Sequence, residues 1–232
     1  MVKKHLKINN MKRYFRYSLL VFVWLTGPCA LVQAIPKLPY FFSDNMVLQQ
    51  LSTPAIWGLA KANTSVSISC SWNKKKYTTV SNSAGKWRIL VNTPIAGGPF
   101  ELTISDGEAL VIKNVLIGEV WLVSGQSNME VPMKGFRDQP INGSNDAIFQ
   151  STNPSIRLFT VPQAVSLTLQ DTIKQANWKL AEPETVTNFS ATAYYFGKYL
   201  FDRLQVPIGL VNISYGGSPI ESFMDANTLT SF

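Results

Sequence analysis

Histidine is almost missing from this sequence of 232 residues, because His5 is its only one. Beyond residue 5, the chain cannot build a Ser–His pair, a Cys–His pair or a histidine-based metal site from its own residues. Cysteine is scarce as well, with Cys29 in the N-terminal segment and Cys70 in the body of the chain. One thiol in the body excludes an intramolecular disulfide there, and we interpret Cys70 as a buried, inert residue.

Charged residues make up only 15% of the sequence, whereas hydrophobic types make up 46% and aromatic types 12%. This composition is typical of a globular protein and differs from that of a disordered chain. The length allows one or two domains with hydrophobic cores.

The first 34 residues have the layout of a secretory signal peptide. Six basic residues and no acidic one accompany the apolar run 17–25, and the small-residue pattern of a cleavage site follows at 32–34. We expect export to the periplasm or the extracellular space, with cleavage near Ala34. The apolar run is shorter than the roughly 20 residues of a membrane span, so we expect no stable membrane insertion, with an N-terminal anchor as the alternative.

The formal net charge of +7 depends on that segment. Without residues 1–34, 15 basic residues remain against 14 acidic ones, which is a net charge of +1. A nearly neutral body differs from the basic surface that nucleic-acid binding requires, so we expect no nucleic-acid partner.

Residues 35–114 have the pattern of an all-β region. Residues 65–69 alternate strictly between serine and an apolar residue, which is the period of a half-buried strand. Clusters of Asn, Gly, Pro and Asp separate the apolar runs. Seven short strands at this spacing predict an antiparallel β-sandwich domain. The predicted strands are 46–49, 55–57, 64–72, 76–80, 86–92, 99–105 and 110–113.

The pattern changes to that of an α/β domain over residues 115–232. Residues 116–123 are almost continuously apolar, as in a strand that is buried on both faces. A helix is predicted over 187–204 with Ser190 as its N-cap, and it lies between two further strands. The order strand, helix, strand predicts a parallel βαβ unit. These two strands are 155–161 and 207–213.

This second region is short for its predicted class. A doubly wound domain usually has about five or more strands, and only three are visible here. We therefore expect an incomplete α/β domain and a truncated chain.

Ser127 follows the predicted strand 116–123 directly, within a polar turn. Open α/β sheets bind ligands at the carboxyl ends of their strands. A serine there presents its hydroxyl beside backbone N–H groups, as a nucleophile and its oxyanion require. The turn differs from the Gly-x-Ser-x-Gly elbow because Met129 replaces the second glycine. A serine that only caps a helix is the alternative.

Four ordered segments resemble those of SGNH hydrolases in the sialate O-acetylesterase branch. Residues 119–129 (EVWLVSGQSNM) are similar to the nucleophile block, and residues 209–221 (GLVNISYGGSPIE) are similar to the second block. Residues 39–49 resemble the opening motif, and residues 96–100 resemble part of the β-sandwich. The resemblance extends over about residues 36–232, although acetylxylan esterases share a similar nucleophile block.

The resemblance implies a β-sandwich followed by a flavodoxin-like SGNH domain, and it assigns roles to individual residues. Ser127 would be the nucleophile and would also donate its backbone N–H to the oxyanion. Gly216 or Gly217 would donate a second backbone N–H, because glycine permits a close approach of the backbone. A plain turn after a strand is the alternative for this pair.

Three polar residues around Ser127 are candidates for lining the substrate site. Each could equally hold the turn through side-chain hydrogen bonds. They are Gln126, Asn128 and Glu130.

The chain departs from the family in its catalytic base. The family uses a third-block asparagine and a C-terminal Asp-x-x-His segment, and neither is recognisable here. We therefore expect negligible activity from these residues alone.

The resemblance implies an acetylated glycan as substrate, with sialic acids as one class, and no metal or organic cofactor. The alternatives are an acetylxylan or other polysaccharide acetylesterase, and a non-catalytic protein that binds carbohydrate through Trp57, Trp72 and Trp87.

Overall fold

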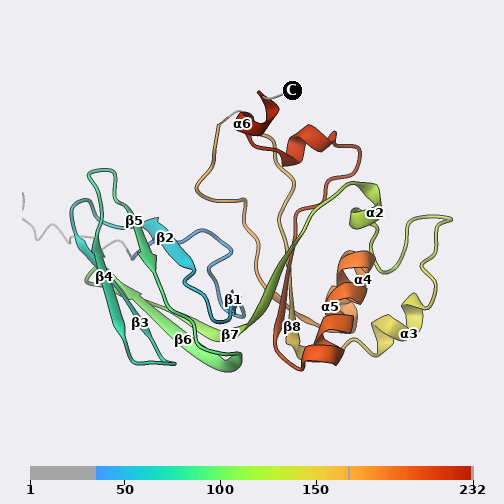
Figure 1. The fold of residues 1–232 in the computed structure, drawn as a ribbon, viewed down its shortest axis with the longest axis horizontal. Helices are drawn as coiled ribbons and strands as arrows, with labels where there is room; N and C mark the ends of the chain where they lie inside the picture. The colour runs from blue at the N-terminus through green and yellow to red at the C-terminus, as the bar shows by residue number, and fades with distance from the viewer. Residues whose placement is uncertain (1–34, 167, 231–232) are drawn as a thin grey trace, which may run out of the picture. The chain divides into compact units, whose positions relative to one another are not determined.

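Strands dominate the first part of the computed structural model, which describes residues 35–166 and 168–230. The predicted signal peptide lies outside these described residues. The first six predicted strands are confirmed, with ends that differ by a few residues (Figure 1). They are β1 (Val47–Gln49), β2 (Ala55–Leu59), β3 (Ser65–Cys70), β4 (Lys76–Val80), β5 (Lys86–Leu90) and β6 (Gly97–Ser105).

One long strand, β7 (Ala109–Val123), replaces the two strands predicted at 110–113 and 116–123. The prediction of a break between them is wrong. Asn114 has a positive φ of 54° at this point, and the pairing of β6 with β7 shifts its register nearby, so the irregularity is absorbed within the strand. The predicted domain boundary at residue 114 therefore falls within β7, and the division into two domains stays a prediction.

The sheet that contains β7 is mixed, with the strand order β4-β3-β6-β7-β10-β8-β9. The first part of β7 pairs antiparallel with β6 and parallel with β1. Its last five residues pair parallel with β10 (Ile208–Asn212). Figure 1 shows β7 running from β6 towards α2, so this strand carries the β-rich region into the helical one.

A separate two-stranded sheet, β2–β5, shares a hydrophobic cluster with β3 and β6. Ile56 and Ile89 belong to the small sheet, and Ile68 and Ile104 to the large one, and none is more than 5% exposed. The structure thus gives a mixed sheet with a shared apolar core, while a distinct β-sandwich domain stays a prediction.

The predicted βαβ unit is confirmed, because β8 (Asn153–Thr160) and β10 are parallel neighbours with α5 (Ala191–Leu204) between them in sequence. The Ser190 hydroxyl accepts a hydrogen bond from the Ala193 N–H at 3.1 Å, which confirms the predicted N-cap. The helix begins later than predicted because a separate helix precedes it. The remaining elements are α2 (Ser127–Glu130), α3 (Ser144–Phe149), β9 (Lys179–Ala181), α4 (Pro183–Thr187), η1 (Ile220–Phe223) and α6 (Ala226–Leu229).

The end of β7 corrects the prediction that 116–123 is buried on both faces. Leu116 and Ile117 are buried, but Trp121 is 41% exposed and Leu122 is 64% exposed. β1 pairs with β7 only as far as Gly118. Beyond that residue, β10 is the single strand that pairs with β7 in the described part of the chain, so the last residues of β7 form an open edge.

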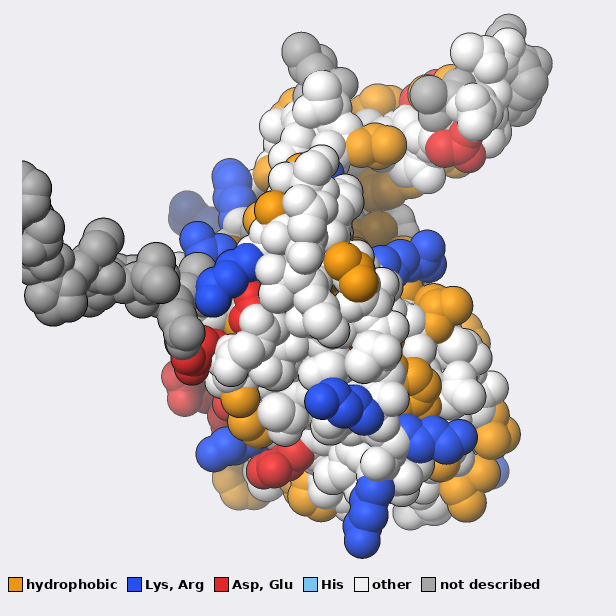
Figure 2. Space-filling view, turned by 90° about the vertical axis from the view of Figure 1, so that its left-hand side faces the viewer, with side chains coloured by type: hydrophobic (Ala, Val, Ile, Leu, Met, Phe, Trp, Pro, Cys, Tyr) orange, Lys and Arg blue, Asp and Glu red, His pale blue; other side chains and the backbone are white. Residues whose placement is uncertain are grey.

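Two surface properties bear on the partners expected from the sequence. Within residues 35–166 and 168–230, no helix combines the length and the apolar character needed to cross a bilayer. On the face drawn in Figure 2, the lysine and arginine side chains are scattered among uncharged and acidic ones. The absence of a nucleic-acid partner stays a prediction.

Candidate active site

The candidate site lies where three parallel strands end at one edge of the sheet. β10 lies between β7 and β8, and the segments that follow these strands meet through backbone hydrogen bonds. The Tyr215 N–H donates to the Gly125 carbonyl at 2.9 Å, and the Val161 N–H donates to the Asn212 carbonyl at 2.9 Å. This edge is where open α/β sheets bind their ligands.

Ser127 is the first residue of α2 and is exposed to solvent. A Cβ added to Gly216 would lie 3.9 Å from the Ser127 Cα. The turn at Gly216 and Gly217, called the diglycine turn below, therefore runs directly beside the serine. The structure thus brings together the two segments that the sequence singled out, 89 residues apart. Their catalytic roles stay predictions.

Glu130 fastens the diglycine turn to α2. Its Oε2 accepts a hydrogen bond from the Gly216 N–H at 2.7 Å, and its Oε1 accepts one from the Gln163 side-chain amide at 2.7 Å. A Cβ on residue 216 would displace the Glu130 carboxylate from its present position, so the absence of a side chain permits this close contact. The carboxylate therefore has a clear role in shaping the site, whereas contact with substrate stays a prediction.

Gln126 and Asn128 differ in what their side chains do. The Gln126 amide donates to the Ser218 carbonyl and so ties the serine turn to the segment after β10. Asn128 is exposed, and its backbone carbonyl accepts a hydrogen bond from the Thr192 hydroxyl at 3.1 Å. Gln126 thus holds the turn, and the Asn128 side chain is left on the open side of α2.

Backbone N–H groups near Ser127 that have no acceptor among the described residues include those of Ser127 itself, Asn128 and Gly217. The Gly216 N–H, in contrast, is engaged by Glu130. Gly217 has a φ of +76°, a left-handed conformation that glycine adopts without strain. Because α2 has only four residues, these local donors matter more than a helix dipole.

A polar pocket of about 620 Å³ adjoins Glu130 and Gln163 at the ends of β8 and β10. Asn212 and Ser214 also line it, and the Ser214 N–H donates to the Asn212 side-chain oxygen at 3.0 Å. Ser127 is not among its lining residues. Sequence reasoning missed Gln163, although its place just after β8 follows the same rule that located Ser127 after β7.

Known proteins match most of this chain, although no family model does. Sialate O-acetylesterase of Mus musculus is 32% identical over 206 residues, a match that covers 82% of this chain and 37% of that protein. The enzyme of the same name from Homo sapiens is 31% identical over 206 residues, covering 82% of this chain and 39% of that protein. The chain belongs to the sialate O-acetylesterase family. This result confirms the resemblance found in the sequence.

A solved structure extends the comparison to the fold of this sialate O-acetylesterase family member. A carbohydrate acetylesterase from Xanthomonas citri superimposes with a TM-score of 0.78 and 34% sequence identity, over 84% of this chain and 43% of that one. The mixed sheet and its few helices therefore fit an SGNH-like fold. The chain spans less than half the length of each of these relatives.

Three carboxylates other than that of Glu130 are engaged elsewhere in this family member. Glu119 accepts hydrogen bonds from the side chains of Gln49 and Gln50, and Asp44 accepts one from a backbone N–H. Asp225 accepts bonds from the first turn of α6, and the backbone N–H of Thr228 lowers its pKa. A carboxylate with a lowered pKa is a poor base at neutral pH.

Metal ligands are equally sparse at this site. In the part of the chain that the structure describes, no group of three or more His, Cys, Asp or Glu side chains is arranged to hold a metal ion.

Proposed function

We propose that this chain carries the nucleophile-bearing part of a carbohydrate O-acetylesterase of the sialate O-acetylesterase type. The observation that carries the proposal is the exposed Ser127 at the end of β7, beside the Gly216 turn at the end of β10. The relatives with that activity in their names support it, since the match covers 82% of this chain.

In the proposed reaction, the Ser127 Oγ attacks the carbonyl carbon of a sugar acetate. Its proton passes to a general base, and the carbonyl oxygen becomes an oxyanion. The C–O bond to the sugar then breaks, the sugar oxygen takes up a proton, and the acetyl group remains on Ser127. Water attacks this ester in the second half-reaction, which releases acetate and restores the serine.

The N–H groups of Ser127 and Gly217 are the proposed donors to the oxyanion. Both are free of intramolecular acceptors among the described residues, which is the state that a preformed oxyanion site requires. The sequence left Gly216 and Gly217 as alternatives. We assign the role to Gly217 because Glu130 already accepts the Gly216 N–H.

The general base is proposed to come from polypeptide outside residues 35–232. The one histidine of the sequence is His5, within the predicted signal peptide. A serine without its base reacts several orders of magnitude more slowly, so the 232 residues alone should turn over aryl acetates negligibly.

The proposed substrate is an O-acetylated glycan, with sialic acids as the first class and acetylated xylan as the alternative. An exposed serine on a sheet edge suits a bulky sugar ester better than a buried pocket would. Hydrolysis of O-acetylated sialic acid measured beside that of acetylated xylan separates the two classes.

The decisive experiment supplies the missing base. Residues 35–232 replace the matching part of the Xanthomonas citri acetylesterase, and hydrolysis of an aryl acetate is measured. We expect the chimera to be active and its Ser127→Ala variant to lose about 10⁴-fold or more. Ser83→Ala, which removes an exposed hydroxyl in the turn between β4 and β5, is the matched control and should keep activity.

A second measurement tests the proposal if the chimera does not fold. The unmodified chain is assayed with added imidazole as an external base, with Ser127→Ala in the same solution as the blank. Imidazole-dependent turnover above that blank supports the proposal. Efficient turnover without any added base, or turnover that survives Ser127→Ala, contradicts it.

A further inference from the structure

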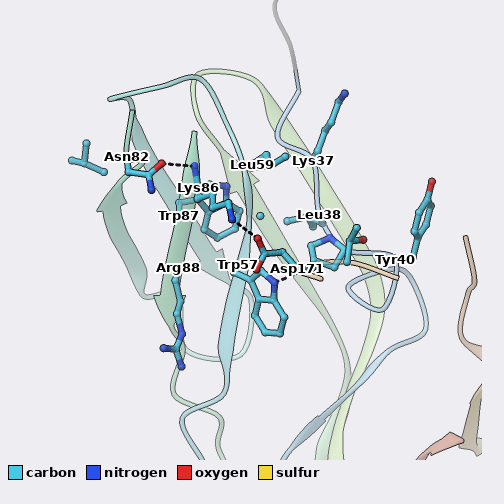
Figure 3. Close-up of a pocket in the computed structure, with 14 residues that line it drawn as sticks. Lys37, Leu38, Tyr40, Trp57, Leu59, Asn82, Lys86, Trp87, Arg88 and Asp171 are labelled. Atoms are coloured by element: carbon cyan, nitrogen blue, oxygen red, sulfur yellow. Dashed lines mark hydrogen bonds and ion pairs between the residues drawn. The ribbon is translucent and has the colours of Figure 1, made fainter. Parts of the chain in front are cut away.

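A second pocket, of about 740 Å³, lies away from Ser127, on the outer face of the β2–β5 sheet (Figure 3). Trp57 on β2 stands directly opposite Arg88 on β5, and Leu59 stands opposite Lys86. Tyr40 and Lys37 line the pocket from the preceding segment. Its volume falls in the range of roughly 300–1,000 Å³ that is usual for small-molecule sites.

The Trp57 ring is fixed rather than loosely exposed. It makes edge contacts with Phe41 and Phe42, at centroid distances of 5.1 and 4.9 Å. Its indole N–H donates to the backbone carbonyl of Asp171 at 3.1 Å. A tryptophan held in this way while it lines a pocket offers a rigid apolar face, which is how aromatic rings stack on sugars.

The charges at the pocket are predominantly positive. Its lining contains the cations of Lys37, Lys86 and Arg88 and a single carboxylate, that of Asp171. Asp171 pairs with Lys86 at 2.5 Å. Within the described residues, Lys37 and Arg88 have no ion-pair partner, so two cations remain available to an anionic ligand.

Polar groups for neutral hydroxyls are present as well. Asn82 contributes its side-chain amide to the lining. The indole N–H of Trp87 is buried without an acceptor among the described residues, and Trp87 is also part of the lining. Figure 3 shows Asp171 between Lys86 and Trp57, so the loop after β8 forms one wall of the pocket.

We propose that this pocket binds an acidic sugar, that is, a pyranose with a carboxylate. The ring would stack on Trp57, and the carboxylate would meet Arg88, whose planar guanidinium suits a carboxylate. A neutral apolar ligand or a neutral sugar would use the aromatic face but gain nothing from the unpaired cations, whereas an acidic sugar would use both. The inference does not depend on ester chemistry at Ser127.

The test compares two sugars that differ in one group. Glucuronic acid and glucose are titrated separately into the full chain labelled with ¹⁵N, and the indole N–H signal of Trp57 is followed by NMR. Glucuronic acid should give a saturable shift, with glucose at least about tenfold weaker, because a hydrogen bond to a charged group is worth about one such factor or more.

Substitutions of exposed residues show which side chain binds the carboxylate of the sugar. Arg88→Gln should weaken glucuronic acid binding about tenfold, while Lys76→Gln on β4 and Ser127→Ala leave it unchanged. Asp171→Asn keeps the carbonyl that holds Trp57 but frees Lys86, so it should strengthen binding about threefold. Circular dichroism verifies that each variant is folded.

Several results would overturn the inference. They are the lack of a saturable shift at Trp57, equal affinities for the two sugars, an Arg88→Gln variant that binds like the parent, and weaker binding by Asp171→Asn. Loss of binding in Ser127→Ala would also overturn it, because the sugar would then be bound at the esterase site.

Discussion

The strands β2 to β6 bury one face of apolar side chains in a shared core, whereas the end of β7 leaves two adjacent large apolar side chains exposed. In the first region, Val66, Ile68, Leu102 and Ile104 are each 0% exposed. At the end of β7, Leu122 is 64% exposed although it lies in a strand of the same sheet. Burial in this molecule thus depends on which face of a strand meets the shared apolar core, because Ile89 on β5 is 5% exposed while its neighbour Leu90 is 52% exposed.

The difference has a positional cause. β7 pairs with β6 between Ala109 and Ile117 and with β1 from Leu116 to Gly118, and from Glu119 it pairs with β10 alone among the described strands. Ser127 follows the open end of this strand. An accessible serine requires such an opening, so the feature that exposes Leu122 also exposes the candidate nucleophile.

The largest expected effect comes from comparing two side-chain truncations, one in each region. Ile104→Ala should lower the free energy of unfolding by about 2–5 kcal/mol, because it removes buried methyl groups and leaves a cavity. Leu122→Ala should change it by no more than about 0.5 kcal/mol, since that side chain is already largely in water. Urea denaturation of each variant, followed by circular dichroism, measures both values.

Each outcome of that pair is informative about the open edge. If Leu122→Ala costs as much as Ile104→Ala, then the end of β7 is covered in solution, for instance by a second copy. Sedimentation at two protein concentrations is the control, because a covering copy would make the cost depend on concentration.

Local patterns in the sequence located most elements, and contacts between distant residues explain the failures. The serine alternation at 65–69 identified β3, and Ser190 identified the cap of α5. Both signals are complete within a few neighbouring residues. The continuity of β7 through Asn114 depends instead on its pairing with β6, which no local pattern reveals.

The candidate site shows the same division. The turn that holds Ser127 was recognisable because strand and turn are adjacent in sequence. The bond between Glu130 and the Gly216 N–H joins residues 86 positions apart, and Gln163 reaches Glu130 from a third segment. The serine turn and the glycine pair were therefore recognisable in the sequence, whereas the proposal of Gly217 over Gly216 as an oxyanion donor needed the fold.

A smaller change in free energy is expected from Glu130→Gln, which lies just after the exposed end of β7. The neutral amide oxygen would accept the Gly216 N–H more weakly than the carboxylate does, at a cost of about 1 kcal/mol. Hydrogen exchange at the Gly216 amide should then become about fivefold faster, as NMR can measure. Glu101→Gln on β6, which removes an exposed charge far from this bond, is the matched control. Unchanged exchange at Gly216 would show that the carboxylate does not hold the turn.

The smallest effect concerns the Cys70 thiol on β3. This residue is 2% exposed, so its predicted burial is confirmed. Burial raises the pKa of this thiol from 9.0 to about 12. The folded state therefore keeps the proton that the unfolded state loses. The resulting stabilisation is complete well below pH 9, is reduced by about 0.4 kcal/mol at pH 9, and continues to fall as the pH rises towards 12. The comparison with Cys70→Ala is made at pH 9, where the effect is small.

Two measurements on Cys70 can separate its burial from other titrations. Iodoacetamide should label the thiol slowly at pH 8.5 in the native protein and rapidly in urea, because only the thiolate reacts. Lysines and tyrosines also titrate above pH 9, so the decline in unfolding free energy is compared with that of Cys70→Ala, which should be shallower. Rapid labelling of the native protein would mean that the β2 to β6 region opens as readily as the end of β7. The two regions would then differ only in the solvent exposure of their side chains in the folded structure.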